Sequence, residues 1–172
     1  TRRLDEDSAF ILGTGVGMPT GIQFEATQGN IVTVNSGLAA ALTYDGLVNM
    51  WAELPAQYHG NASILMNQST LARIMLLKDN ENRPLFGVNE SVPNILGRPI
   101  VISEFMPDVA ANTIPIIMGD FSRGYGIADR MDLRIIRLNE RYAPNIGLLA
   151  VARVGGQMLR SQPFVSQTIA VV

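Results

Sequence analysis

The chain has 172 residues, 47% of them hydrophobic and 16% charged, with a formal net charge of −2 and no cysteine. This composition excludes an intrinsically disordered chain, a disulfide framework and thiolate chemistry, and it argues against bulk nucleic-acid binding, which needs concentrated positive charge. Lys78 is the only lysine among 13 basic residues. Because arginine is enriched and lysine depleted at protein interfaces, this arginine-rich and charge-poor composition favours a surface that partners cover.

The first third of the chain predicts helices around one loop and one strand. Residues 1–12 have the pattern of the end of a helix, and the glycine-rich residues 13–21 predict a rigidly turned loop. The β-branched residues 31–34 predict a strand, and Asp45 is the expected cap of a second helix. The expected inward-facing residues of that helix are Leu47, Met50, Trp51 and Leu54.

The middle of the chain predicts a buried strand followed by a helix. Residues 62–66 form the strand, Asn67 or Ser69 caps the helix, and residues 78–83 form a polar turn after it. The expected inward-facing residues of the helix are Leu71, Ile74, Met75 and Leu77.

The remainder of the chain is rich in predicted strands that glycine and proline turns separate. The predicted strands are residues 99–103, 114–118, 125–128, 133–138, 146–154 and 158–169. A few early helices followed by many strands, without alternation of the two, predict an α+β fold. The length predicts one domain, or one domain with a small appendage.

The glycine-rich loop does not fit a nucleotide-binding motif. A dinucleotide fingerprint that starts at Gly13 would place its third glycine at Met18, and one that starts at Gly15 would place it at Thr20. A phosphate-binding loop needs a lysine after its last glycine, and the only lysine lies more than fifty residues away. Turn geometry therefore explains these glycines better than phosphate binding.

Other candidate catalytic groups are sparse. His59 is the only histidine and lies in a polar stretch that predicts a surface loop, where it has no set of metal ligands or triad partners beside it. Three acids, Asp120, Asp129 and Asp132, fall near strand ends and could assemble a carboxylate pair. The competing interpretation is that these acids cap turns or pair with Arg123, Arg130 and Arg134.

Several short motifs follow one another along the chain. NQSTLARIMLLKDNENRPLF at 67–86 precedes LGRPIV at 96–101, MGDF at 118–121 and YGIADR at 125–130. Upstream lie SAFILGTG at 8–15 and MPTGI at 18–22, and downstream lies RVGGQMLRSQPF at 153–164. In this order the motifs resemble the major capsid proteins of tailed bacteriophages, which have the Hong Kong 97-type fold.

The resemblance implies an α+β phage major capsid fold with an axial domain and peripheral-domain strands. By this resemblance residues 38–130 form the axial domain, and residues 1–37 and 131–172 contribute to the peripheral domain. The chain would lack the N-terminal arm, the extended loop and most of the spine helix. The loops at 86–94 and 108–113 would lie near the fivefold and sixfold axes.

The same resemblance implies contacts between subunits but no chemistry. The residues expected at assembly interfaces are Asp79, Asn82, Arg83, Asp108, Asn112, Arg130, Asp132, Arg141 and Asn145. Asn82 replaces a family glycine, which is a mild change because asparagine tolerates left-handed backbone. Asn145 falls near the acceptor of the family's Lys–Asn cross-link, but apolar residues 150–152 replace its assisting glutamate, so we expect no cross-linking.

The function that the resemblance implies is that of a structural subunit of an icosahedral phage or prophage shell. Copies would self-assemble into pentamers and hexamers that enclose double-stranded DNA without sequence-specific binding, in a virion assembled in the host bacterial cytoplasm. Scaffold, protease and portal proteins are the expected partners, and no membrane, cofactor, metal or catalytic residue is expected. An encapsulin-type shell is the alternative, and a metal-dependent enzyme that uses Asp120, Asp129 and Asp132 is a remote one.

Overall fold

The computed structural model describes residues 2–39, 41–78, 81–83, 85, 94–138 and 147–170, and the side chains of residues 2–6, 39, 132 and 133 are not described. Its helices are α1 (Arg2–Leu12), α2 (Ile22–Thr27), α3 (Tyr44–Glu53), the 3₁₀ helix η1 (Ala56–Asn61), α4 (Gln68–Met75) and α5 (Phe121–Gly124). Its strands are β1 (Val32–Ala39), β2 (Ser63–Met66), β3 (Asn94–Ile95), β4 (Arg98–Ile102), β5 (Ile116–Gly119), β6 (Tyr125–Leu138), β7 (Gly147–Met158) and β8 (Phe164–Ala170). The predicted α+β fold is confirmed.

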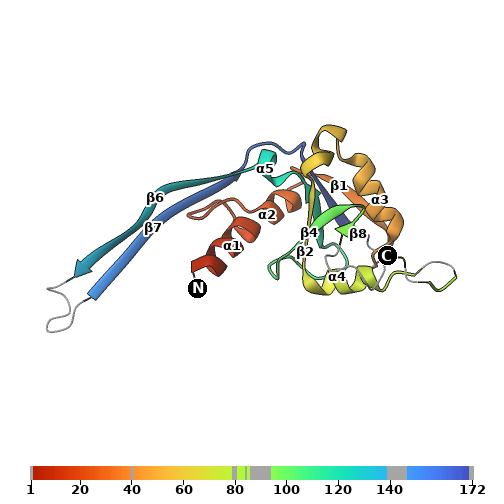
Figure 1. Cartoon of the computed structure of the whole chain (residues 1–172), viewed down its shortest axis with the longest axis horizontal. Helices are drawn as coiled ribbons and strands as arrows, with labels where there is room; N and C mark the ends of the chain where they lie inside the picture. The colour runs from red at the N-terminus through yellow and green to blue at the C-terminus, as the bar shows by residue number, and fades with distance from the viewer. Residues whose placement is uncertain are drawn as a thin grey trace.

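The strands form two separate sheets. A six-stranded sheet has the order β1-β8-β5-β2-β4-β3, in which β1 is parallel to β8 and β2 is parallel to β4. Strands β6 and β7 form a two-stranded antiparallel sheet, named here the ribbon, which extends away from the six-stranded sheet on the left of Figure 1. The molecule therefore has a sheet-and-helix body and one long projection.

The side chains of β2 contribute to the hydrophobic core on both faces of the six-stranded sheet, because successive side chains of a strand point to opposite faces. Ile64 and Met66 are fully buried in a cluster with Leu47 and Met50 of α3 and Ile74 of α4. Leu65 points to the other face, where it joins a second cluster. That cluster also holds Ile11, Ile22, Met106, Ile117 and Phe164.

Two predicted helix starts can be compared with the structure. Asn67 caps α4, as one of the two alternatives predicted, because its side-chain oxygen accepts from the backbone N–H groups of Ser69 and Thr70. The predicted cap at Asp45 is wrong: Thr43 caps α3 and accepts from Gly46, while Asp45 lies in the first turn. Met75, predicted to face inward on α4, is 44% exposed.

The late strands run differently from the prediction. Residues 125–128 and 133–138 belong to one continuous strand, β6, whose pairing with β7 shifts register between Asp129 and Arg134. The predicted break between residues 154 and 158 is also wrong, because Gly155 and Gly156 continue the ladder and β7 ends at Met158. The six-stranded sheet joins β1 and β8 to β2, β4 and β5.

Candidate functional site

The ribbon carries large apolar side chains that nothing in the described chain covers. Strands β6 and β7 pair only with each other there. Their exposed apolar residues are Ile127, Met131, Ile135, Ile136, Leu148 and Leu149. A two-stranded ribbon is marginally stable alone in water, so apolar groups along it favour a structure in which something packs against it.

Both faces of the ribbon carry exposed apolar side chains. Directly opposite residues of an antiparallel pair share a face, and so do residues two apart on one strand. Ile136 lies opposite Leu149 on one face, together with Arg134. Arg137 lies opposite Leu148 on the other face, together with Ile135. Each face thus combines apolar side chains with an arginine, the residue that interfaces favour among cations.

The base of the ribbon is tied to the N-terminal part of the chain. The Tyr125 hydroxyl donates to the carbonyl of Thr20 over 2.8 Å, and the Thr20 N–H donates to the carbonyl of Gly156 over 2.9 Å. Burial, with a smaller contribution from Glu25, raises the pKa of Tyr125 to about 12. The ring of Phe10 meets Tyr125 edge to face with centroids 6.1 Å apart. These contacts fix the base of the ribbon to the N-terminal part of the chain.

The glycine-rich loop, residues 13–21, contacts the base of the ribbon. Thr14 and Thr20 form a β-bridge across it, and Gly15 and Gly17 have φ angles of 80° and 70°. A side chain on Gly156 would place its Cβ 2.6 Å from the Tyr125 hydroxyl oxygen, so the close contact of loop and ribbon requires glycine there. The prediction of turn geometry for residues 13–21 agrees with these contacts.

A second apolar surface lies between α1 and the sheet. This cleft, of about 430 Å³ and named here the α1 cleft, is mostly apolar and has one acid, Asp7, in its lining. Its other main lining residues are Phe10, Leu65, Val101, Phe121 and Ile127. Val101 pairs with Leu65 and so points to the same sheet face, yet Val101 is 48% exposed while Leu65 is 6% exposed. The helices α1 and α2 therefore leave the β4 side of that face uncovered.

The loop after β4 holds two of the expected interface residues, Asp108 and Asn112. Asp108 accepts hydrogen bonds from the side chains of Asn67 and Ser69 at the start of α4. These bonds, Ser69 first, lower the pKa of Asp108, with a smaller contribution from Arg73. Asn112 has a φ of 61° and donates its N–H to the carbonyl of Ile169 in β8. The loop is thus fixed to the body at both ends.

The other expected interface residues lie elsewhere. Asn82 has a φ of 65°, as expected for a residue in a position of a family glycine, and Arg83 forms an exposed ion pair with Glu81 at 3.7 Å. Arg130 is exposed on β6 of the ribbon. The described members of this set thus lie on three segments: the loop after β4, the turn after α4, and β6. Asp79, Arg141, Asn145 and the side chain of Asp132 lie outside the described residues.

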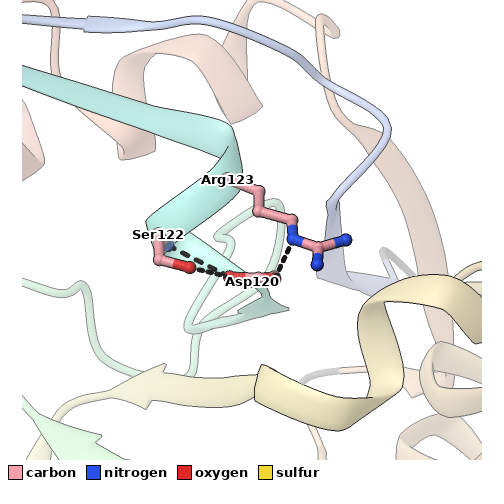
Figure 2. Close-up of polar contacts among 3 residues, drawn as sticks. All are labelled: Asp120, Ser122 and Arg123. Carbon is pink, nitrogen blue, oxygen red and sulfur yellow. Dashed lines mark hydrogen bonds and ion pairs between the residues drawn. The ribbon is translucent and has the colours of Figure 1, made fainter.

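The acids considered for catalysis have other partners. Asp120 is 1% exposed, and its Oδ1 accepts from the backbone N–H and the hydroxyl of Ser122, so it caps α5 (Figure 2). Its Oδ2 lies 3.6 Å from Nε of Arg123. Capping and pairing with Arg123, the competing interpretation of the sequence, are what the structure shows for Asp120. Among the described residues, no group of three His, Asp or Glu could hold a metal ion.

His59 is in the 3₁₀ helix η1 rather than in an irregular loop. Its ring lies 3.9 Å from the ring of Trp51, and its Nε2 lies 2.7 Å from the carbonyl oxygen of Leu54. Arg98 of β4 lies over the same Trp51 ring at 5.0 Å. This stack joins α3, η1 and β4. Sequence reasoning missed it because its three members are spread over 48 positions, and no local spacing indicates the contact.

Within the described parts of the chain, no helix is long and apolar enough to cross a membrane.

Comparison with known proteins gives a consistent result. Residues 2–168 match the model of the phage capsid family. No sequence among curated proteins matches the chain. The capsid of the empty GTA particle has 33% sequence identity over 97% of this chain and 62% of that chain, with a TM-score of 0.87. The capsid of the native GTA particle gives the same identity and TM-score and is covered to 61%.

More distant structures share the fold. The holo-SrpI encapsulin complex from Synechococcus elongatus has 14% identity and a TM-score of 0.68, with 97% of this chain and 61% of that chain covered. The chain spans about three fifths of the length of the GTA capsid chains. The Hong Kong 97-type fold implied by the sequence motifs is confirmed by these similarities.

Proposed function

The chain belongs to the phage capsid family, and we propose that it is the shell-forming part of a structural capsid subunit. Copies of the subunit assemble into pentamers and hexamers that close into an icosahedral shell around double-stranded DNA. The role is structural rather than catalytic. The shell is part of a virion that is assembled in the host cytoplasm with scaffold, protease and portal proteins.

The observation that carries this proposal is the ribbon. It exposes apolar side chains and arginines on both faces, and a free monomer gains nothing from such a projection. Contacts between copies would bury these side chains, and heterologous contacts repeated around an axis close into rings. The charge-poor composition supports the same conclusion, because much of the surface would be covered in a shell.

We assign the axial domain to the six-stranded sheet with α3 and α4, and the peripheral domain to α1 and the ribbon. This assignment keeps most of residues 38–130 as axial. It adds residues 32–39 and 164–170, since β1 and β8 pair with each other and β8 pairs with β5. Asp79, Asn82, Arg83, Asp108 and Asn112 would then serve axial contacts, and Arg130, Asp132, Arg141 and Asn145 peripheral ones.

An encapsulin-type shell is the second candidate, because the SrpI encapsulin shares the fold. Genes beside this one separate the two candidates: portal, protease and terminase genes favour a capsid, and a cargo enzyme favours an encapsulin.

Electron microscopy of the whole gene product tests the proposal. We expect closed shells from the unchanged protein and from Ala52→Glu, which changes an exposed residue of α3. Leu148→Asp places a charge at a position that is 71% exposed, so the protein should fold but should not form shells. Failure of the unchanged product to form any shell, or shells from Leu148→Asp in normal yield, would contradict the proposal.

A further inference from the structure

One polar side chain of the hydrophobic core is buried without a hydrogen bond. Gln167 lies in β8, between β1 and β5, and is 0% exposed. Among the described residues, neither Nε2 nor Oε1 of its amide has a hydrogen-bond partner. A buried amide without a partner loses its hydrogen bonds to water on folding and gains none in return. Because native cores satisfy nearly all such groups, the amide of Gln167 needs a partner.

The side chain of Gln167 points toward α3. Val165 and Ile169, two residues before and two residues after it on β8, belong to the cluster that packs on α3, and alternate residues of a strand share a face. A Cβ on Gly46, in the first turn of α3, would lie 2.3 Å from Nε2 of Gln167. The amide is therefore packed against the backbone at the start of this helix.

Two oxygen atoms lie around the same point. The Cβ position of Gly46 would be 3.1 Å from Oγ1 of Thr43 and 3.2 Å from the carbonyl oxygen of Ser36. The Thr43 hydroxyl donates to this carbonyl and accepts from the backbone N–H of Gly46. These bonds use one lone pair of each oxygen, and a hydroxyl or carbonyl oxygen has two. The start of α3 thus presents acceptor atoms beside the donor of the Gln167 amide.

The chemistry of these groups favours water as the partner. The amide and the two oxygens are neutral, so they suit a neutral ligand that both accepts and donates hydrogen bonds. Water does both, and an internal water typically makes about three hydrogen bonds to polar groups that otherwise have no partner.

We propose that the Gln167 amide and the start of α3 hold an internal water molecule, which accepts from Nε2 and donates to the carbonyl oxygen of Ser36 or to Oγ1 of Thr43. This water links three elements, since Ser36 is in β1, Thr43 caps α3 and Gln167 is in β8. The site also explains the glycine at position 46. Glycine is less favourable than alanine inside a helix, but a Cβ at this position would meet the amide.

A crystal structure of the whole chain, at a resolution that shows ordered water, tests the site. We expect a water within hydrogen-bond distance of Nε2 of Gln167 and of one of the two oxygens. Gln167→Met keeps the length of the side chain and removes the amide, so this water should be absent from its structure. Gln162→Met changes an exposed glutamine just before β8 and should keep the water. A Gln167 amide that bonds directly to another group of the protein, or that packs without water, would overturn the proposal.

Magnetic relaxation dispersion of water gives a second measurement in solution, because it counts the long-lived internal waters of a protein. Gln167→Met should have fewer such waters than the unchanged protein, and Gln162→Met should have the same number. The same count in all three proteins would overturn the proposal.

Position 46 tests where the water lies. Gly46→Ala places a methyl group where the amide and the water meet, so it should remove the water and lower the free energy of unfolding in urea. Gln167→Ala makes room for this methyl group, so the two changes together should cost less than the sum of their separate effects. Gly60→Ala is the control, because a Cβ there would meet nothing within 4 Å. Retention of the water in Gly46→Ala, or additive effects in the double variant, would overturn the placement beside α3.

Discussion

Asn67 donates a hydrogen bond from its side-chain amide to Oδ1 of Asp108 over 2.8 Å. The oxygen of the same amide accepts from the backbone N–H groups of Ser69 and Thr70. One buried side chain therefore both caps α4 and holds the loop that follows β4. Since that loop carries Asn112, this contact fixes a surface that we assign to the axial domain.

The first prediction concerns the pH dependence of this contact. Hydrogen bonds from Ser69 and Asn67 hold the pKa of Asp108 below its ordinary value of 3.8. The folded state thus binds this proton less readily than the unfolded state. The resulting stabilisation is complete above pH 3.8 and is lost as the pH falls through the lowered folded-state pKa.

Urea unfolding of the unchanged protein and of Asp108→Asn, followed by circular dichroism from about pH 6 down to about pH 3, checks this prediction. The difference in free energy of unfolding between the two proteins should shrink on the acid side. A difference that stays constant over this range would contradict the assigned role of the carboxylate.

The second prediction concerns Gly124, the last residue of α5. A Cβ on Gly124 would lie 2.2 Å from Cε2 of Phe164, whose ring is fully buried and meets Phe121 edge to face. Gly124→Ala should therefore lower the free energy of unfolding by about 1–3 kcal/mol through overpacking. The cost should be smaller in the presence of Phe164→Leu, which a double-mutant cycle in urea measures. Gly155→Ala is the control, because a Cβ there would come no closer than 3.8 Å to another residue. If the effects of Gly124→Ala and Phe164→Leu on the free energy of unfolding are additive, the ring of Phe164 is not the reason that position 124 needs glycine.

The third prediction concerns the single tryptophan. His59 stacks on Trp51 at 3.9 Å, so His59→Ala should uncover the indole and lower the free energy of unfolding by about 0.5–1.5 kcal/mol. The emission maximum of Trp51 should move to the red in the folded protein. Gln57→Ala, an exposed change on the same 3₁₀ helix, should leave both the emission and the stability unchanged. An unshifted spectrum in His59→Ala would show that the stack does not shield the indole.

The fourth prediction separates a structural from a metal-binding role of Asp120. Its Oδ1 is engaged by Ser122, so Asp120→Ala should cost about 1–2 kcal/mol through loss of the cap of α5. Calorimetric titration with Mn²⁺ should give no saturable heat. Saturable Mn²⁺ binding to the unchanged protein that Asp120→Asn abolishes would instead support the interpretation as a metal-dependent enzyme.

Much of the fold was predictable where local chemistry decides the structure. The strand at 62–66 and the cap at Asn67 follow from an apolar run and an amide before a helix, and both are present in the structure. Asp45 was predicted as the cap of α3, but Thr43 takes that place, since its hydroxyl oxygen accepts from the N–H of Gly46. Two such candidates within three residues cannot be ranked by residue type alone.

The ribbon shows why the remaining features could not be predicted. Three of residues 129–132 are charged, which predicts a break in the strand, yet pairing with β7 continues β6 through them. Gly155 and Gly156 suggest a turn, but both lie within the ladder. Position 156 needs glycine because Phe10 and Tyr125 approach it too closely for a side chain. The α1 cleft likewise joins Asp7, Leu65 and Val101, which are far apart in the sequence. Contacts between distant segments determine these features.

Electron cryomicroscopy of particles assembled from the whole gene product shows directly whether the ribbon is a contact between subunits. We expect a closed shell in which each ribbon is in contact with a neighbouring copy. A closed shell whose ribbons extend into solvent without contact to another copy would contradict it.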